Sequence, residues 1–109
     1  MLAAARARIV RYTPNDVAAD PDLLVVDIRS VDERERTGVI SGSRHVPYAV
    51  LQWRADQTCE WRDEELAGRR FCLVCMQGFS SSLAAASLVE LGVDAGDLIG
   101  GYEGWVAAQ

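Results

Sequence analysis

The sequence predicts an α/β domain built around a mainly parallel sheet. Two continuous apolar runs, within Leu23–Val26 and Arg70–Val74, have the composition of strands that are covered on both faces. Apolar residues from Leu83 to Leu91 then recur at helical spacing. Strands that alternate with helices are typical of parallel sheets. The chain has 109 residues, half of them hydrophobic, which suits a single core, so we expect residues 1–109 to form one domain.

Local signals place the other elements of the N-terminal half. A short edge strand is expected at Arg8–Tyr12, followed by a helix that Thr13 caps and Pro14 opens and that ends near Ala19. The core strand at Leu23–Val26 comes next. Ser30 is the expected N-cap of a charged, exposed helix over residues 31–36, which Gly38 closes.

The remaining elements are shorter or bounded by glycine and proline. We expect a strand at Arg44–Val46 that Pro47 stops, a helix over residues 49–54, and a polar surface loop over 55–69 with one helical turn near Asp63–Leu66. After the second core strand, Gly92 ends the long helix. The last strand lies within Val93–Ile99, Gly100-Gly101 forms a turn, and Trp105 anchors a terminal helix over residues 103–108.

Composition excludes several classes of function. The formal net charge is −5, and eleven arginines spread along the chain, with no lysine, form no basic patch for nucleic acid. No apolar run approaches the roughly 20 residues of a membrane span, and the alanine-rich start lacks the features of a signal peptide. We therefore expect a cytoplasmic protein that binds neither nucleic acid nor membrane.

Cys75 is the strongest candidate for a catalytic residue. It follows a core strand and precedes a helix, so it faces unpaired backbone N–H groups and the positive end of the helix dipole. Both favour the thiolate, which is the nucleophilic form of cysteine. The carboxyl ends of parallel strands are also where active sites of such sheets lie.

The other candidate ligands and nucleophiles are expected to be structural. Three cysteines are an odd number, which favours reduced thiols, and one histidine with no second Cys-x-x-Cys gives no tetrahedral metal site. Cys72 lies inside a strand, so we expect a core thiol and not a Cys72–Cys75 redox pair. Cys59 is expected to be an incidental surface cysteine, with a resolving thiol as the alternative. We expect His45 to be structural, and Arg29 to form an ion pair with Glu33.

Four motifs in order resemble those of one family. They are Asp27-Ile28-Arg29 with Glu33; the connector from Gly38 to Pro47; Cys75 with Gly78, Ser80 and Ser81; and Gly100-Gly101 with Trp105. From about Leu23 to Trp105 the chain resembles the rhodanese-homology family, the single-domain sulfurtransferases. The resemblance implies a rhodanese-like fold, with a central, mainly parallel five-stranded sheet flanked by helices on both faces.

The resemblance also implies a function. Cys75 would take a sulfane sulfur from thiosulfate or another small donor, become a persulfide, and pass the sulfur to cyanide or a thiol, protein thiols included. The substrate would be held mainly by backbone N–H groups of the loop, from Met76, Gln77, Gly78, Phe79, Ser80 and Ser81. No metal or cofactor is required. Many relatives carry an arginine at the position of Ser80 or a basic residue at that of Met76, so thiosulfate would meet less positive charge here.

Three other functions are alternatives to sulfur transfer. A phosphatase or arsenate reductase would need an arginine at the position of Ser81, which five residues separate from the cysteine, to bind the oxyanion. A non-catalytic binding or regulatory module would not need Cys75 and the glycine of its loop. A thiol redox protein would need the paired cysteines that we do not expect here.

Overall fold

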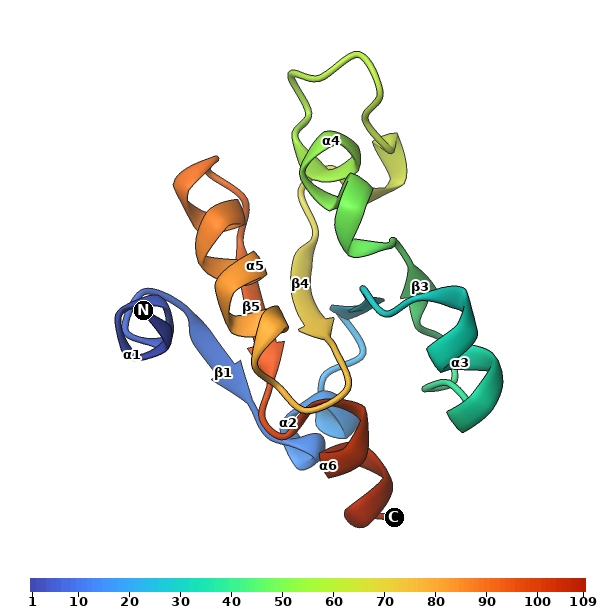
Figure 1. Ribbon diagram of the computed structural model, residues 1–109. Coiled ribbons are helices and arrows are strands. Elements are labelled where there is room, and N and C mark those ends of the chain that lie inside the picture. Colours follow the sequence, from blue (N-terminus) through green and yellow to red (C-terminus); the bar gives the residue numbers. More distant parts are fainter.

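Five strands form one sheet in the order β1-β5-β4-β2-β3 in the computed structural model, which describes all residues 1–109 (Figure 1). Every neighbouring pair of strands is parallel. The strands are β1 (Val10–Tyr12), β2 (Leu23–Asp27), β3 (Arg44–His45), β4 (Arg70–Val74) and β5 (Ala95–Leu98). This is the predicted α/β architecture, and the two apolar core strands, β2 and β4, lie side by side near the middle of the sheet.

Helices connect the strands, as parallel pairing requires. They are α1 (Leu2–Arg6), α2 (Pro14–Ala19), α3 (Val31–Thr37), α4 (Leu51–Ala55), α5 (Ser80–Glu90) and α6 (Gly101–Ala107), with 3-10 turns η1 (Tyr48–Val50) and η2 (Glu64–Leu66). None of the helices combines the length and the hydrophobicity needed to cross a membrane.

Two capping boxes begin α2 and α3 where the sequence indicates. The Thr13 and Ser30 side chains accept hydrogen bonds from the N–H groups of Asp16 and Glu33, whose carboxylates accept the N–H groups of the two caps. Gly38, with φ +98°, ends α3 as predicted.

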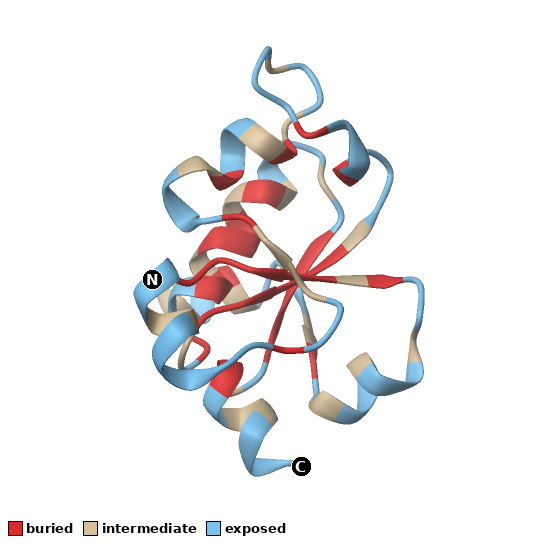
Figure 2. Ribbon diagram, turned by 90° about the vertical axis from the view of Figure 1, so that its right-hand side faces the viewer, coloured by how far each residue is buried: buried red, intermediate tan, exposed pale blue.

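The core lies on both faces of the sheet. Along β4, Phe71 and Leu73 belong to one apolar cluster, together with residues of α4 and α5, whereas Cys72 and Val74 belong to a second cluster, against which Val17 and Trp105 pack. Alternate residues of a strand point to opposite faces, which explains this division. Buried residues accordingly gather along the strands and on the helices packed against them (Figure 2).

Several element boundaries differ from the predictions. Helix α1 was not predicted, and the first strand is limited to Val10–Tyr12 because α1 and a turn occupy the residues before it. The helix expected at 49–54 is divided into η1 and α4, and α6 begins at Gly101, two residues early. The strand expected at Arg44–Val46 ends at His45.

Candidate active site

Cys75 follows β4 directly and lies five residues before α5. Strand β4 is the central strand of the sheet, with β2 and β5 on either side. The cysteine therefore occupies the carboxyl edge of a parallel sheet, where loops from neighbouring strands converge. The residue is only 8% exposed, and its sulfur accepts hydrogen bonds from the segment that follows it.

Two backbone N–H groups donate to the sulfur of Cys75. The Gly78 nitrogen lies 3.1 Å from Sγ and the Ser81 nitrogen lies 3.3 Å away. The thiol also lies 3.3 Å from the Ser81 hydroxyl oxygen, which accepts its proton. Fixed N–H dipoles at these distances stabilise negative charge on the sulfur.

The carbonyl groups of the loop are held on its outer side. The Tyr102 N–H donates to the Cys75 carbonyl at 2.8 Å, and the Glu103 N–H donates to the Met76 carbonyl at 3.0 Å. In a trans peptide the C=O and N–H point in opposite directions, so the Met76 and Gln77 N–H groups turn away from α6, toward the inside of the loop. Neither these two N–H groups nor those of Phe79 and Ser80 have an acceptor within the protein. Four donors therefore remain for a ligand.

The Gly100-Gly101 turn packs directly beneath this loop. A Cβ on Gly101 would lie 2.5 Å from the Cys75 carbonyl oxygen and 2.7 Å from the Gln77 and Gly78 nitrogens, and Gly101 also has φ +61°. Only glycine permits so close an approach of two backbone segments. The paired glycines thus fit the loop against α6.

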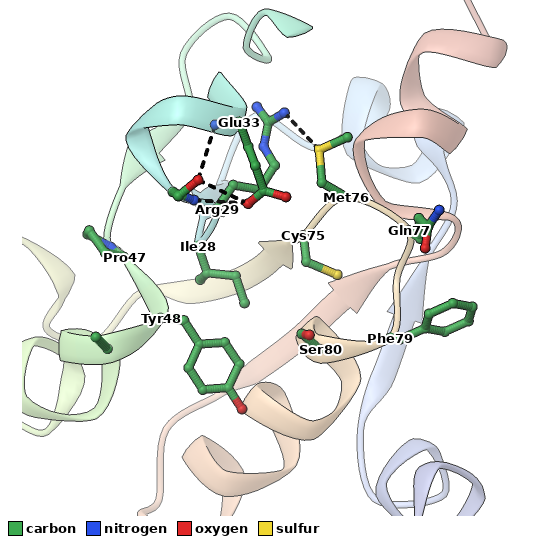
Figure 3. A pocket seen from close by; sticks show the side chains of 12 residues that line it. Ile28, Arg29, Glu33, Pro47, Tyr48, Cys75, Met76, Gln77, Phe79 and Ser80 are labelled. Atoms are coloured by element: carbon green, nitrogen blue, oxygen red, sulfur yellow. Dashed lines mark hydrogen bonds between the residues drawn. The ribbon is translucent and has the colours of Figure 1, made fainter. Parts of the chain in front are cut away.

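A cavity of about 440 Å³ opens beside Cys75 (Figure 3). Its lining comes from three parts of the chain: the loop after β4 with the first residue of α5, the segment after β2 with the first turn of α3, and Pro47 with the first two residues of η1. The lining residues are Ile28, Arg29, Ser30, Glu33, Pro47, Tyr48, Ala49, Cys75, Met76, Gln77, Phe79 and Ser80.

The predicted site residues divide into two groups. Met76, Gln77, Phe79 and Ser80 line the cavity with Cys75. Gly78 and Ser81 are buried behind it and contact the sulfur through their N–H groups. Phe79 is 56% exposed and points away from Cys75 at the rim of the cavity (Figure 3). Phe79 is the N-cap of α5, and Ser80 is the first residue of that helix.

Arg29 lines the cavity but has no free donor. Its five N–H groups reach both carboxylate oxygens of Asp27 at 3.0 and 2.8 Å, the Thr37 hydroxyl at 2.7 Å, the Gly38 carbonyl at 2.8 Å and the Met76 sulfur at 3.5 Å. The Tyr102 ring covers the guanidinium group at 4.1 Å. The predicted ion pair with Glu33 is wrong. The Glu33 carboxylate accepts the N–H of Ser30 in the capping box, and Arg29 lies before the first turn of α3.

Asp27 is a buried carboxylate that pairs with two arginines. Burial alone would raise the pKa of this carboxyl group. Hydrogen bonds from Arg29 and the charges of Arg29 and Arg34 outweigh that effect and hold the pKa below its usual value. Asp27 pairs with both Arg29 and Arg34, and of these three residues only Arg29 lines the cavity.

Cys72 and Cys75 do not form a disulfide, since all three cysteines are free. Cys72 is fully buried in the cluster opposite that of Cys75, as its place inside β4 predicts. Burial, reinforced by the charge of Asp97, raises the pKa of the Cys72 thiol far above its ordinary value. Cys72 is thus an unreactive core thiol.

His45 contacts the cavity wall from behind. Its Nε2 lies 2.7 Å from the Arg29 carbonyl oxygen and must donate a proton to it, since a carbonyl only accepts. This contact supports the structural role expected for His45. No group of three or more His, Cys, Asp or Glu side chains is arranged to hold a metal ion.

Asp97 and the arginines at positions 6 and 11 were not predicted to be near the site. Asp97 is completely buried under the loop and accepts the hydroxyl protons of Ser81 at 2.8 Å and Ser82 at 2.7 Å. Arg6 and Arg11 reach the Gly78 carbonyl. The one signal in the sequence is an aspartate inside an otherwise apolar last strand, which demands a buried partner.

The fold and this loop define an α/β domain with a cysteine cradled by backbone N–H groups. The chain belongs to the rhodanese family, because the model of the rhodanese-like domain matches residues 14–108. The sequence-based assignment to this family and the rhodanese-like fold are thereby confirmed.

Solved structures share the fold over nearly the whole chain. A Rhodopseudomonas palustris protein of unknown function, described as a possible tyrosine phosphatase, is 27% identical with a TM-score of 0.91, over 98% of this chain and 86% of its own. A rhodanese-related protein of Thermoplasma volcanium is 23% identical with a TM-score of 0.74, over 90% and 91% of the two chains. A thiosulfate sulfurtransferase of Pseudomonas aeruginosa is 24% identical with a TM-score of 0.72, over 93% of this chain and 18% of its own. A search of curated protein sequences gave no match.

Proposed function

We propose that the protein is a sulfurtransferase that carries a sulfane sulfur as a persulfide on Cys75. The observation that supports this most directly is the loop of Cys75, in which two N–H groups donate to Sγ and four more have no acceptor. Such a loop stabilises one negative charge on a thiolate and, after transfer, on the outer sulfur of a persulfide.

The reaction has two displacement steps at sulfur. The Cys75 thiolate attacks the outer sulfur of the donor, a new S–S bond forms, and the electron pair of the broken donor bond leaves with the rest of the donor. That leaving group is sulfite from thiosulfate, a sulfinate from a thiosulfonate, or a thiolate from a persulfide. An acceptor thiolate or cyanide then attacks the outer sulfur and releases the Cys75 thiolate.

The charges around the cavity favour donors other than thiosulfate. The Arg29 guanidinium has all five N–H groups occupied, and the Glu33 side chain adds a carboxylate to the lining. A dianion therefore meets no free cationic donor in the cavity. We propose that persulfides or thiosulfonates, which carry less charge, transfer sulfur faster than thiosulfate does.

Phosphate ester hydrolysis is a second candidate because of the description of the R. palustris relative. Phosphoryl chemistry on a cysteine loop requires a guanidinium fork that binds the phosphate oxygens. Ser81 occupies the place where that arginine would stand, and Ser81 is fully buried against Asp97. The site lacks the required group, so we expect no turnover of an aryl phosphate.

The test is a mass measurement on the intact, reduced protein. The protein is incubated separately with thiosulfate, a thiosulfonate and a low-molecular-weight persulfide, and we expect an adduct of one sulfur atom on Cys75. Cys75→Ser should form no adduct. Cys72→Ser should retain most transfer, because the Cys72 thiol that it removes is buried in the core. If folded wild-type protein forms no adduct with any donor, the sulfurtransferase proposal is refuted and a non-catalytic binding module takes its place. Equal loss in both variants would instead indicate dithiol redox chemistry.

A further inference from the structure

The carbonyl of Gly78 is held from outside the loop by arginines of the N-terminal segment. Arg6, at the end of α1, donates from Nη2 to this oxygen at 2.9 Å, and Arg11, in β1, donates at 3.4 Å. The Arg6 Nε also donates to the Ser82 hydroxyl at 3.1 Å. These arginines precede the rhodanese-like match, which begins at residue 14.

Asp97 fixes this arrangement from beneath. It lies directly opposite Arg11 in the pairing of β1 with β5 and accepts two hydrogen bonds from its guanidinium, at 2.8 and 3.2 Å. The same carboxylate accepts the hydroxyl protons of Ser81 and Ser82. The Ser82 hydroxyl lies 3.2 Å from the Gly78 carbonyl but only 2.7 Å from Asp97, so Asp97 is its better acceptor. The arginines are therefore the principal donors to the Gly78 oxygen.

The orientation of one peptide unit follows from these contacts. The Gly78–Phe79 peptide is trans and planar, so its N–H points away from the carbonyl that the arginines hold. The Phe79 N–H consequently turns into the loop, on the side of Cys75, and it has no acceptor in the protein. Gly78 itself has φ +87°, and a Cβ there would lie 3.0 Å from the Gly100 nitrogen and 3.2 Å from that of Gly101. The peptide is thus held on both sides.

We propose that Arg6 and Arg11, fixed by Asp97, are positioning residues for sulfur transfer: they hold the Gly78–Phe79 peptide so that the Phe79 N–H binds the outer sulfur of the Cys75 persulfide. This inference rests on the proposed sulfurtransferase function. Neither arginine touches the substrate. Their charge is directed to a carbonyl, which orders a donor, and not to the cavity, where it would bind an anion.

The experiment compares Arg6→Gln with Arg6→Lys and with Arg8→Gln as the matched control. Arg8 lies two residues away, is half-exposed and pairs with Glu90 without contacting the loop. The Phe79 N–H acts on charge that develops during transfer, so Arg6→Gln should lower kcat and kcat/KM together by about tenfold, with KM unchanged. Arg6→Lys keeps a charged donor and should recover most of the loss, and Arg8→Gln should behave as wild type.

A second readout follows the donor itself. In ¹H–¹⁵N spectra of the wild type, persulfide formation should move the Phe79 amide proton downfield, as a new hydrogen bond does. In Arg6→Gln this shift should be reduced, while the Gly78 and Ser81 amides, which already donate to Sγ, respond as in the wild type.

The outcomes separate this inference from the proposed function. If the wild-type protein forms no persulfide with any donor, the proposed sulfurtransferase function itself is contradicted. Wild-type protein that forms the persulfide, with Arg6→Gln equally fast or changed only in KM, overturns the positioning role alone. The positioning role is also overturned if Arg8→Gln loses as much activity as Arg6→Gln, or if the Phe79 shift in Arg6→Gln equals that of the wild type. A general effect on the N-terminal segment would then explain the kinetics.

Discussion

The Arg11–Asp97 ion pair joins the edge strand β1 to the strand beneath the active-site loop, and it should stabilise the fold strongly. The Asp97 side chain is 0% exposed and that of Arg11 is 20% exposed. Removal of either partner leaves a charge that is largely cut off from water. We expect Arg11→Met and Asp97→Asn each to lower the free energy of unfolding by about 3 kcal/mol at pH 7.

The double variant distinguishes an ion pair from two independent contributions. If the charges interact, Arg11→Met with Asp97→Asn should cost about 4 kcal/mol and not the sum of the single effects, a coupling free energy of about 2 kcal/mol. The free energy of unfolding of all three variants is measured by urea unfolding, followed by tryptophan fluorescence. The comparison requires that the m value stays constant.

Asp94→Asn is the control for this cycle. Asp94 immediately precedes β5 and is exposed, so its substitution should change stability by no more than about 0.5 kcal/mol. Additivity of the two single substitutions to within about 0.5 kcal/mol would refute the reasoning, because it would mean that the two charges do not interact.

Two further predictions concern the loop and the wall of the cavity. Gly101→Ala should destabilise the fold by about 3 kcal/mol and slow persulfide formation, since the added Cβ would lie 2.5 Å from the Cys75 carbonyl oxygen. Gly42→Ala is the control, because Gly42 has φ +81° but open space around it. In the same urea assay it should cost only the backbone strain of a positive φ, about 1 kcal/mol. The depressed pKa of Asp27 contributes stability that is fully present above its unfolded value of about 4 and is lost as pH falls through the lower folded value. The Tm should therefore fall more steeply for wild type than for Asp27→Asn as the pH is lowered from about 5 to about 2. Parallel curves of Tm against pH would contradict the lowered pKa of Asp27.

The sequence was most informative where a local pattern determines the structure. The continuous apolar runs of β2 and β4 predicted two core strands, which the structure places side by side, and Thr13 and Ser30 predicted the starts of two helices. Each of these signals acts over a few residues. The Cys75 loop was likewise predictable, because a strand, a glycine-containing turn and a helix follow one another without interruption.

The partners of charged residues were not predictable in the same way. Spacing along a helix suggested that Arg29 pairs with Glu33, but Arg29 precedes the N-cap of α3 and has no helical neighbour there. Asp27 lies two residues earlier, on the same side of the extended chain, and is the nearer carboxylate. The contact of Arg11 with Asp97 joins residues 86 positions apart and depends on the register of β1 against β5. Local pattern does not define that register.

The positions of the arginines bear on the class of substrate. A guanidinium directed into a cavity neutralises a dianion such as thiosulfate or a phosphate ester, whereas one bound to a carbonyl only orders the N–H on the other side of the peptide. Here the Arg29 donors end on protein acceptors, and the Arg6 and Arg11 donors near the loop end on Gly78, Ser82 and Asp97. The site thus offers ordered N–H dipoles without a free cation. Such dipoles match the single negative charge of a persulfide sulfur better than the charge of a dianion, which is the physical reason to expect transfer between thiols rather than from thiosulfate.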